Sequence, residues 1–252
     1  MARGDGGYSR EQLRDYLQWD IDTWKHALLH WDAVLKRYNP SGGEALELGA
    51  RDGGLSLYLA EKGMRVICSD LYGPTPLARE LHERYGVCDR VSYEAVNALD
   101  TAFESERFDV VIFKSILGGI GTHLDYAAIQ TALAEIQRIL RPGGLLLFAE
   151  NQHGSLFHQK ARARFVSWGK TWYYVSLREL EELLSPFSSH EIGTYGVLSC
   201  VKKDFAPFIA FDRLVCRSHK SPRHYMAFGH AVRGQEPMGL AAGQTAAHKH
   251  AE

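Results

Sequence analysis

Apolar residues near the start of the chain recur every three or four positions. This spacing predicts helices whose apolar stripe faces a core, with the members Leu13, Leu17, Ile21, Trp24, Leu28, Trp31 and Leu35. Ser9 and Gln12 form a capping box ahead of the stripe, since each can bond an otherwise unpaired backbone amide. Asp20 and Asp22 both suit the cap of a second helix, so we expect a break near them. The Asn-Pro-Ser-Gly-Gly run at 39–43 ends the helical region.

After residue 43 the pattern changes to short apolar runs that alternate with helical segments. The expected strands span 45–48, 65–69, 91–96, 108–113 and 145–149, and the expected helices span 53–62, 76–85 and 126–140. This alternation predicts βαβ units and a parallel sheet, and therefore an α/β fold. The runs at 109–113 and 145–149 are apolar throughout, as expected of strands covered on both faces.

The C-terminal third is less regular. Ser176 and Glu179 form a second capping box, which opens a helix that runs to Leu184. Segment 187–198 can hold a strand, and 225–232 predicts a final one. From residue 233 onward the chain is rich in Gly, Ala, Gln and His and has little to bury, so 233–252 is expected to be a disordered tail.

Composition narrows the class of protein. The 252 residues are 45% apolar with a formal net charge of -1, which fits a globular domain and argues against a nucleic-acid binder, because such proteins carry a basic excess. The four cysteines are far apart and form no C-x-x-C pair, so we expect no disulfide framework and no metal site. No apolar stretch reaches the roughly 18 residues that span a bilayer, and the polar start lacks a signal-peptide core. We therefore expect a cytoplasmic protein without membrane contact.

A glycine-bearing turn follows the strand at 45–48. The residues from Glu47 to Gly53 are Glu-Leu-Gly-Ala-Arg-Asp-Gly. Gly49 lets the backbone approach a ligand closely, and Gly53 relieves crowding where a helix packs back on the strand. A nicotinamide-binding turn would show G-x-G-x-x-G, but Arg51 stands at the middle position. The turn thus predicts a nucleotide site and disfavours a nicotinamide oxidoreductase.

Polar residues end the next two strands. Asp70, followed by Leu71, lies 21 residues beyond Gly49, where a carboxylate can accept both hydroxyls of an adenosine ribose. Asn97, followed by Ala98, ends the third strand and can contact an adenine edge. Since ligands of open α/β sheets bind at the carboxyl ends of the strands, these residues predict an adenosine site.

Together with the Leu-Arg-Pro-Gly-Gly turn at 140–144, these residues resemble the class I S-adenosylmethionine-dependent methyltransferases over about 44–150. The resemblance implies a Rossmann-like, doubly wound, mostly parallel seven-stranded sheet with an antiparallel last strand, plus N-terminal helices. It also implies S-adenosylmethionine as the cofactor. The units would be an N-terminal helical cap at 1–43, a methyltransferase domain at 44–232 with acceptor-side insertions at 151–222, and the tail at 233–252.

The resemblance also implies roles for individual residues. The methionine part would be surrounded by the turn, the ribose held at the second strand, the adenine contacted at the third, and the sulfonium flanked at the fourth. The cofactor-binding residues are then Glu47, Gly49, Ala50, Arg51, Gly53, Asp70, Leu71, Asn97, Ala98 and Lys114. Two departures stand out, because Arg51 replaces a glycine of the family turn and Asn97 replaces a common acidic residue.

Segment 151–178 contains no Asp or Glu but interleaves basic and aromatic residues. One interpretation is a pocket for an anionic or aromatic acceptor, and the other is a solvated helix face followed by core aromatics. The candidate acceptor residues are Arg162, Arg164, Trp168, Trp172 and Tyr173. His123 and His153 follow the fourth and fifth strands and are the candidate general bases, although histidines are often plain surface residues.

The sequence therefore predicts a methyltransferase that acts on a small molecule, with O-methylation in specialised-metabolite, sugar or lipid biosynthesis as the leading reaction. Methylation of a carboxylate would suit the acid-free segment and would need no base. Two alternatives stay open: an RNA- or protein-modifying methyltransferase, and a protein that binds S-adenosylmethionine without turnover. The acceptor and the oligomeric state are also open, with a homodimer as one state to test.

Overall fold

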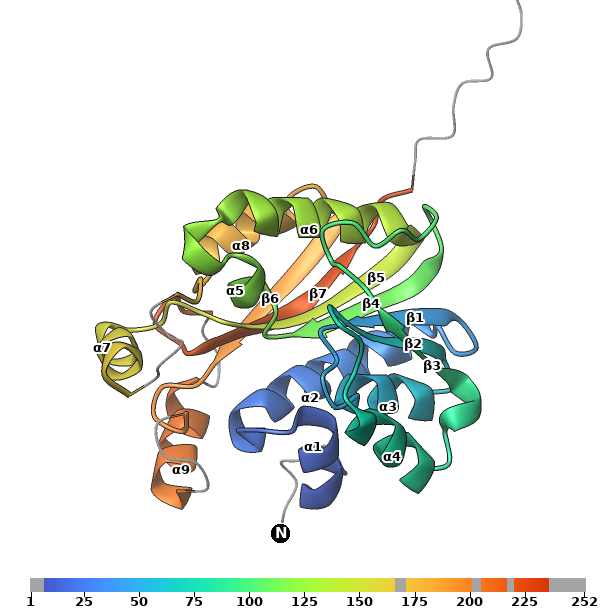
Figure 1. The fold of residues 1–252 in the computed structure, drawn as a ribbon. Helices are drawn as coiled ribbons and strands as arrows, with labels where there is room; N and C mark the ends of the chain where they lie inside the picture. The colour runs from blue at the N-terminus through green and yellow to red at the C-terminus, as the bar shows by residue number, and fades with distance from the viewer. Residues whose placement is uncertain (1–6, 166–170, 201–204, 217–219, 236–252) are drawn as a thin grey trace, which may run out of the picture.

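The structure is a computed structural model that describes residues 7–165, 171–200, 205–216 and 220–235. Within these residues one seven-stranded sheet forms the centre of the molecule, in the order β3-β2-β1-β4-β5-β7-β6 (Figure 1). All neighbouring strands are parallel except at β7, which runs antiparallel to both β5 and β6. This confirms the predicted mixed sheet. The strands are β1 (Glu44–Leu48), β2 (Arg65–Asp70), β3 (Val91–Ala95), β4 (Phe108–Lys114), β5 (Leu140–Asn151), β6 (Ser189–Tyr195) and β7 (Met226–Val232).

Helices cover both faces of the sheet (Figure 1). One core joins the sheet to α1, α2 and α3, and the other joins it to α6 and α8. Helices α7 and α9 lie together at one end. The helices are α1 (Arg10–Leu17), α2 (Ile21–Tyr38), α3 (Gly54–Glu61), α4 (Pro76–Arg84), α5 (Leu117–Ile120), α6 (Tyr126–Ile139), α7 (Leu156–Phe165), α8 (Leu177–Leu184) and α9 (Ala206–Val215), with short 3-10 turns η1 (Cys88–Arg90) and η2 (Thr122–Leu124).

The N-terminal helices follow the predicted pattern. Both bonds of the Ser9–Gln12 capping box are present at the start of α1. The helix breaks after Leu17, and Asp20 takes the N-cap position of α2, although its side chain makes no capping hydrogen bond. Trp31 is fully buried and its Nε1 donates to the Gly229 carbonyl at 3.0 Å. This bond ties α2 to β7.

Two parts of the C-terminal half differ from the expected elements. Strand β5 begins at Leu140 and not at 145 as expected, because Leu140 pairs with Phe108 of β4. The two glycines of the predicted turn, Gly143 and Gly144, form backbone hydrogen bonds with Arg233. Helix α9 was not predicted. At the start of α8, the Ser176–Glu179 capping box forms as expected.

The predicted tail begins slightly too early. Arg233 bonds through its backbone to Gly144 and pairs through its guanidinium with Glu106 at 2.9 Å. It therefore belongs to the folded domain, whereas 236–252 lie outside the described residues. No helix among the described residues is long and apolar enough to cross a membrane.

Candidate functional site

A cavity of about 460 Å³ opens at the carboxyl ends of β1, β2, β3 and β4. This volume lies in the range of small-molecule sites, and the location is the one where α/β sheets bind ligands. Its lining is mainly apolar with a few polar groups, and comprises Leu48, Gly49, Arg51, Asp70, Leu71, Val96, Asn97, Ala98, Leu99, Ser115, Ile116, Gly119, Ile120 and Trp172. Six of the predicted cofactor residues and one predicted acceptor residue therefore share one cavity.

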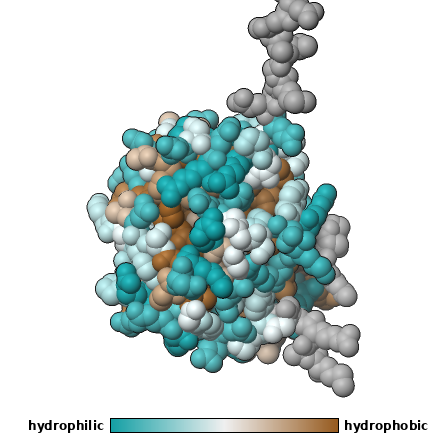
Figure 2. Space-filling view, turned by 90° about the vertical axis from the view of Figure 1, so that its right-hand side faces the viewer, coloured by the Kyte–Doolittle hydropathy of each residue, from teal (hydrophilic) through white to brown (hydrophobic). Residues whose placement is uncertain are grey.

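A second cavity, of about 270 Å³, lies at the amino ends of the strands and is lined by charged residues such as Arg65, Asp89 and Arg107. Figure 2 views the side opposite α7 and α9, which is mostly hydrophilic with separate apolar patches. Because the amino ends of parallel strands are not where such sheets bind nucleotides, we take the first cavity as the candidate site.

The turn between β1 and α3 shapes one wall of this cavity. Gly49 has a φ of +69°, and a Cβ there would lie 2.3 Å from the Ile116 side chain. Gly53 is also left-handed, and its Cβ would meet His82 at 2.8 Å. Arg51 adopts a φ of +49°, which is unusual for a residue with a side chain. The backbone therefore keeps the left-handed shape that suits the family's glycine, while the Arg51 side chain stays largely exposed.

Asp70 is held at the cavity rim by the backbone. One carboxylate oxygen accepts from the Arg51 amide at 2.9 Å and the other from the Leu71 amide at 2.8 Å. Each oxygen keeps a second acceptor position for a hydroxyl. Asn97 uses its side-chain oxygen to accept from the Leu99 amide at 3.0 Å. An adenine contact from Asn97 would therefore share that oxygen or use the amide nitrogen.

The other turn residues lie behind this wall. Glu47 and Ala50 are buried, and neither they nor Gly53 line the cavity. The Glu47 carboxylate accepts from the Ser56 amide at 2.6 Å and from the Leu55 amide at 3.3 Å, which fixes the start of α3. Burial raises the pKa of Glu47 to about 7, despite these hydrogen bonds. Any contact of Glu47 with a methionine tail stays a prediction.

Beside Glu47 lie two more buried ionisable groups at the strand ends. The Glu150 carboxylate accepts from the amides of Leu117 at 2.8 Å and Asn151 at 3.0 Å, and burial raises its pKa to about 7. Lys114, the last residue of β4, is 8% exposed, and its Nζ makes no hydrogen bond within the described residues. Burial lowers the pKa of Lys114 well below its usual value, although Glu47 opposes the shift.

The N-terminal helices cover Lys114. Its Nζ lies 3.0 Å from the centre of the Trp19 ring and 4.8 Å from that of Trp24, which is a cation–π arrangement for the charged amine. Trp19 lies on the α1–α2 turn between two residues with positive φ, Gln18 and Asp20. The turn therefore shields the Lys114 amine from water. Sequence reasoning missed Trp19 and Glu150 as parts of this layer.

The predicted acceptor residues separate. Trp172 lines the cavity, and a Cβ on Gly118 would lie 1.7 Å from its Nε1, so its ring rests directly on that glycine. Arg162 is buried away from the cavity, where Nη1 donates to the carbonyls of Gln152 and His153 and the guanidinium stacks on Tyr174. Arg164 is exposed, and Trp168 lies outside the described residues.

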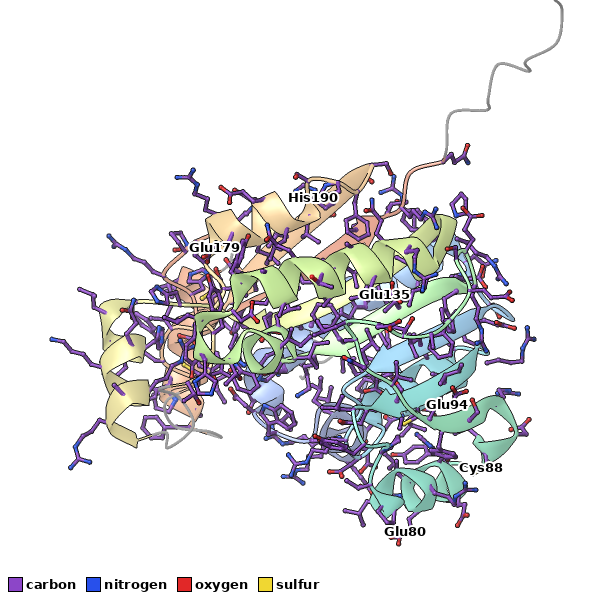
Figure 3. All side chains as sticks on the ribbon, turned by 45° about the horizontal axis from the view of Figure 1, so that its top comes forward. Glu80, Cys88, Glu94, Glu135, Glu179 and His190 are labelled. Atoms are coloured by element: carbon purple, nitrogen blue, oxygen red, sulfur yellow. The ribbon has the colours of Figure 1, made fainter. Side chains whose placement is uncertain are left out.

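Tyr173 is held by α8. Its hydroxyl donates to Glu179 at 2.5 Å (Glu179 is labelled in Figure 3), and burial with this carboxylate raises the pKa of Tyr173. The two candidate bases, His123 and His153, are both exposed and outside the lining of the cavity. The catalytic role predicted for these histidines gains no support from the geometry.

Comparison with known proteins identifies the domain. Residues 46–148 match the family model for a methyltransferase domain. The tRNA 5-carboxymethoxyuridine methyltransferase of Escherichia coli K12 is 28% identical over 169 residues, which cover 66% of this chain and 59% of that protein. The chain thus spans less than two thirds of this relative.

Solved structures share the fold. Haemonchus contortus phosphoethanolamine N-methyltransferase 2, in complex with S-adenosyl-L-methionine, superposes with a TM-score of 0.58 at 22% identity, covering 90% of this chain and 58% of that one. The [4+2]-cyclase SpnF superposes with a TM-score of 0.57 at 20% identity, covering 92% and 85%. The domain match, the strand order and the cavity at the strand ends agree, and residues 46–148 carry a methyltransferase domain.

Proposed function

We propose that this chain binds S-adenosylmethionine in the cavity at the carboxyl ends of β1–β4 and transfers its methyl group to an oxygen of an acceptor. The observation that carries the proposal is the position of Asp70, whose carboxylate is fixed at the rim by two backbone amides. This geometry fits the two hydroxyls of a ribose. Beside it, Leu71, Val96 and Leu99 offer apolar walls for an adenine ring.

The chemistry requires little acid or base from the protein. Bound S-adenosylmethionine supplies a methyl group that is already activated by the sulfonium. The chain's own residues then have to orient the acceptor and exclude water. The Trp172 ring and the Ile116 side chain line the cavity on the side of β4 and α5 and are suited to that task. A carboxylate acceptor is ionised at neutral pH, so it would react without a general base.

The first candidate acceptor is a small anionic or aromatic molecule, as predicted from the segment after β5. Trp172 is the residue of that segment whose placement supports this idea. Because Arg162 is engaged with two backbone carbonyls, recognition of an acceptor carboxylate by this residue would need a rearrangement.

The second candidate acceptor is a modified nucleoside in tRNA. The Escherichia coli relative carries such an acceptor in its name. The charge distribution agrees, because residues 151–233 contain 12 Lys and Arg against 6 Asp and Glu, whereas residues 1–150 contain 16 against 22. The near-neutral total thus hides a basic C-terminal region, and exposed cations such as Lys160, Arg213 and Arg223 belong to it. These observations favour the RNA acceptor, whereas the net charge of the whole chain argued against it.

The cofactor role is tested by calorimetry with S-adenosylmethionine. Asp70→Ala removes the ribose partner, and we expect a loss of about 1–3 kcal/mol, or roughly 5- to 150-fold in Kd. The control is Asp89→Ala, because Asp89 lines the other cavity at the amino ends of the strands. Unchanged affinity in a folded Asp70→Ala variant would refute the assigned ribose contact.

The acceptor is tested with S-adenosylmethionine labelled in its methyl group. The purified chain is incubated with bulk tRNA and, separately, with a low-molecular-weight metabolite fraction. Label in tRNA, with binding that falls steeply as salt rises, would support the nucleoside. Label only in the small-molecule fraction would support the first candidate. Cofactor binding without label in either fraction would leave a binding protein and refute methyl transfer to both candidates.

A further inference from the structure

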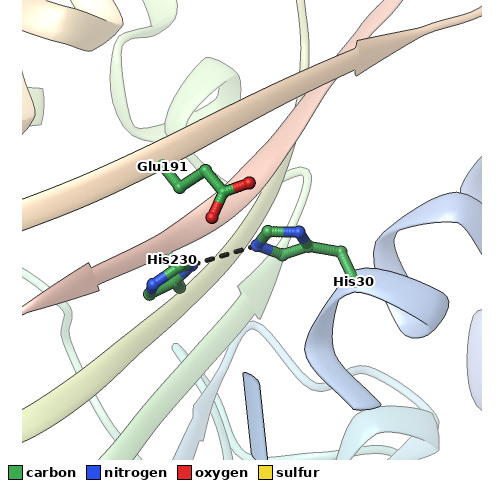
Figure 4. Close-up of side chains that lie close together, drawn as sticks. All are labelled: His30, Glu191 and His230. Carbon is green, nitrogen blue, oxygen red and sulfur yellow. Dashed lines mark hydrogen bonds between the residues drawn. The ribbon is translucent and has the colours of Figure 1, made fainter. Parts of the chain in front are cut away.

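Three side chains that ligate metals well meet near the β6 edge of the sheet. His30 comes from α2, Glu191 from β6 and His230 from β7 (Figure 4). His30 Nε2 and His230 Nδ1 lie 3.0 Å apart, and a carboxylate oxygen of Glu191 is within 4.8 Å of both. None of the three lines the cofactor cavity. The cluster is therefore separate from the proposed methyl-transfer site.

The fold brings these residues together from distant parts of the chain. Glu191 and His230 are register partners in the antiparallel β6–β7 pair, so their side chains share one face of the sheet. Helix α2 packs on β7, and the hydrogen bond from Trp31 to Gly229 fixes its position there. His30 precedes Trp31 and points at His230 (Figure 4).

The hydrogen bond between the two rings suits a metal. It needs one shared proton, which one ring nitrogen carries and the other accepts with its lone pair. A metal ion binds such a lone pair, and a cation could take the place of the shared proton.

The distances suit a tetrahedral ion. With zinc–nitrogen bonds of about 2.0–2.1 Å, two ligands of a tetrahedral zinc lie about 3.4 Å apart. The two histidine nitrogens are already close to that separation. Glu191 is exposed, so its side chain can move the remaining distance without disturbing a core.

We propose that His30, His230 and Glu191 form a site for a divalent transition-metal ion, with Zn²⁺ as the best match. Two imidazoles and one carboxylate are a ligand set that zinc uses, with water in the fourth position. The bound ion joins α2 to β6 and β7. It therefore stabilises the packing of the N-terminal helices on the sheet.

The test uses the full chain after treatment with a chelator. Zn²⁺ is titrated by calorimetry, and the melting temperature is followed with and without the ion. We expect one ion per chain and a higher melting temperature. Glu191→Gln and His30→Gln should each weaken Zn²⁺ binding roughly tenfold or more, since each removes one of three ligands. The control is His190→Ala, because His190 (labelled in Figure 3) neighbours Glu191 but pairs with Ala231, on the opposite face.

Co²⁺ provides a second readout, because its absorption distinguishes nitrogen and oxygen ligands from cysteine thiolates. We expect a spectrum without a thiolate band that His30→Gln diminishes. Equal Zn²⁺ affinity in the parent and in both ligand variants, or a thiolate band, would overturn the proposal. Absence of binding to a chain whose circular dichroism is native would also overturn it, and the cluster would then be a histidine–histidine hydrogen bond alone.

Discussion

The buried carboxyl of Glu150 should make the free energy of unfolding depend on pH. This carboxyl is 1% exposed, and burial raises its pKa from 4.5 to about 7. Between these values the folded chain holds a proton that the unfolded chain has lost. The free energy of unfolding must therefore fall as pH rises through this window, and flatten above about pH 7. The shift corresponds to about 3 kcal/mol, and Glu47 adds a second contribution of the same sign.

Glu150→Gln removes the titrating group and keeps its shape. We expect the fall in unfolding free energy between about pH 5 and about pH 7.5 to shrink by about 2 kcal/mol, because this window holds most but not all of the effect of the shift. The amides of Leu117 and Asn151 donate to different carboxyl oxygens of Glu150, and glutamine has only one side-chain oxygen. At the lower pH the variant should therefore be less stable by about 1–3 kcal/mol, since one amide loses its acceptor. Urea unfolding followed by circular dichroism at several pH values measures both effects.

Glu135→Gln is the matched control. Glu135 lies on α6 (Figure 3), and the hydrogen bond from Arg138 lowers its pKa to about 2. Its stabilising contribution is lost only as pH falls below the unfolded value, so the variant should keep the parent's slope above about pH 5. If Glu150→Gln shows the same fall as the parent, the buried carboxyl is not protonated in the folded chain and the reasoning is refuted.

Two further substitutions test the packing around the site and the core. Gly118→Ala should weaken S-adenosylmethionine binding roughly tenfold, in line with the ~1–3 kcal/mol of overpacking, because its Cβ would lie 1.7 Å from Trp172 Nε1. Gly234→Ala is the control, because Gly234 does not line the cavity and its Cβ would lie 3.5 Å from the nearest side chain, so it should bind as the parent does. Calorimetry showing equal losses in the two variants would contradict this account. Trp31→Ala should lower the free energy of unfolding by about 3–5 kcal/mol, measured by urea unfolding, since the ring is fully buried. Trp31→Phe should recover most of this loss. A nearly neutral Trp31→Ala would show that α2 adds little to the core.

Local signals in the sequence predicted much of the fold. The two capping boxes, at Ser9 and Ser176, act over three residues and formed as expected. The strands before the cavity carry continuous apolar runs, and Asp70 and Asn97 sit where strand ends had to converge. Helix α9 was missed because its apolar residues, such as Phe211 and Leu214, remain partly exposed and follow no clear buried stripe.

Contacts between distant segments were beyond the reach of sequence patterns. Trp19 meets Lys114 across 95 residues, and no spacing rule connects them. His30 and His230 are separated by 200 residues and become neighbours only through the packing of α2 on β7. The same limit applies to Arg162, whose charge indicated an acceptor role but whose guanidinium is held by nearby carbonyls.

The seal that the α1–α2 turn forms over Lys114 has a practical consequence for work on this protein. A shortened version lacking the first 38 residues would keep the matched domain at 46–148, yet it would open the Lys114 amine to solvent. The ionisation of this amine would then return toward its ordinary value. Inactivity of such a trimmed version would therefore say nothing about the longer chain.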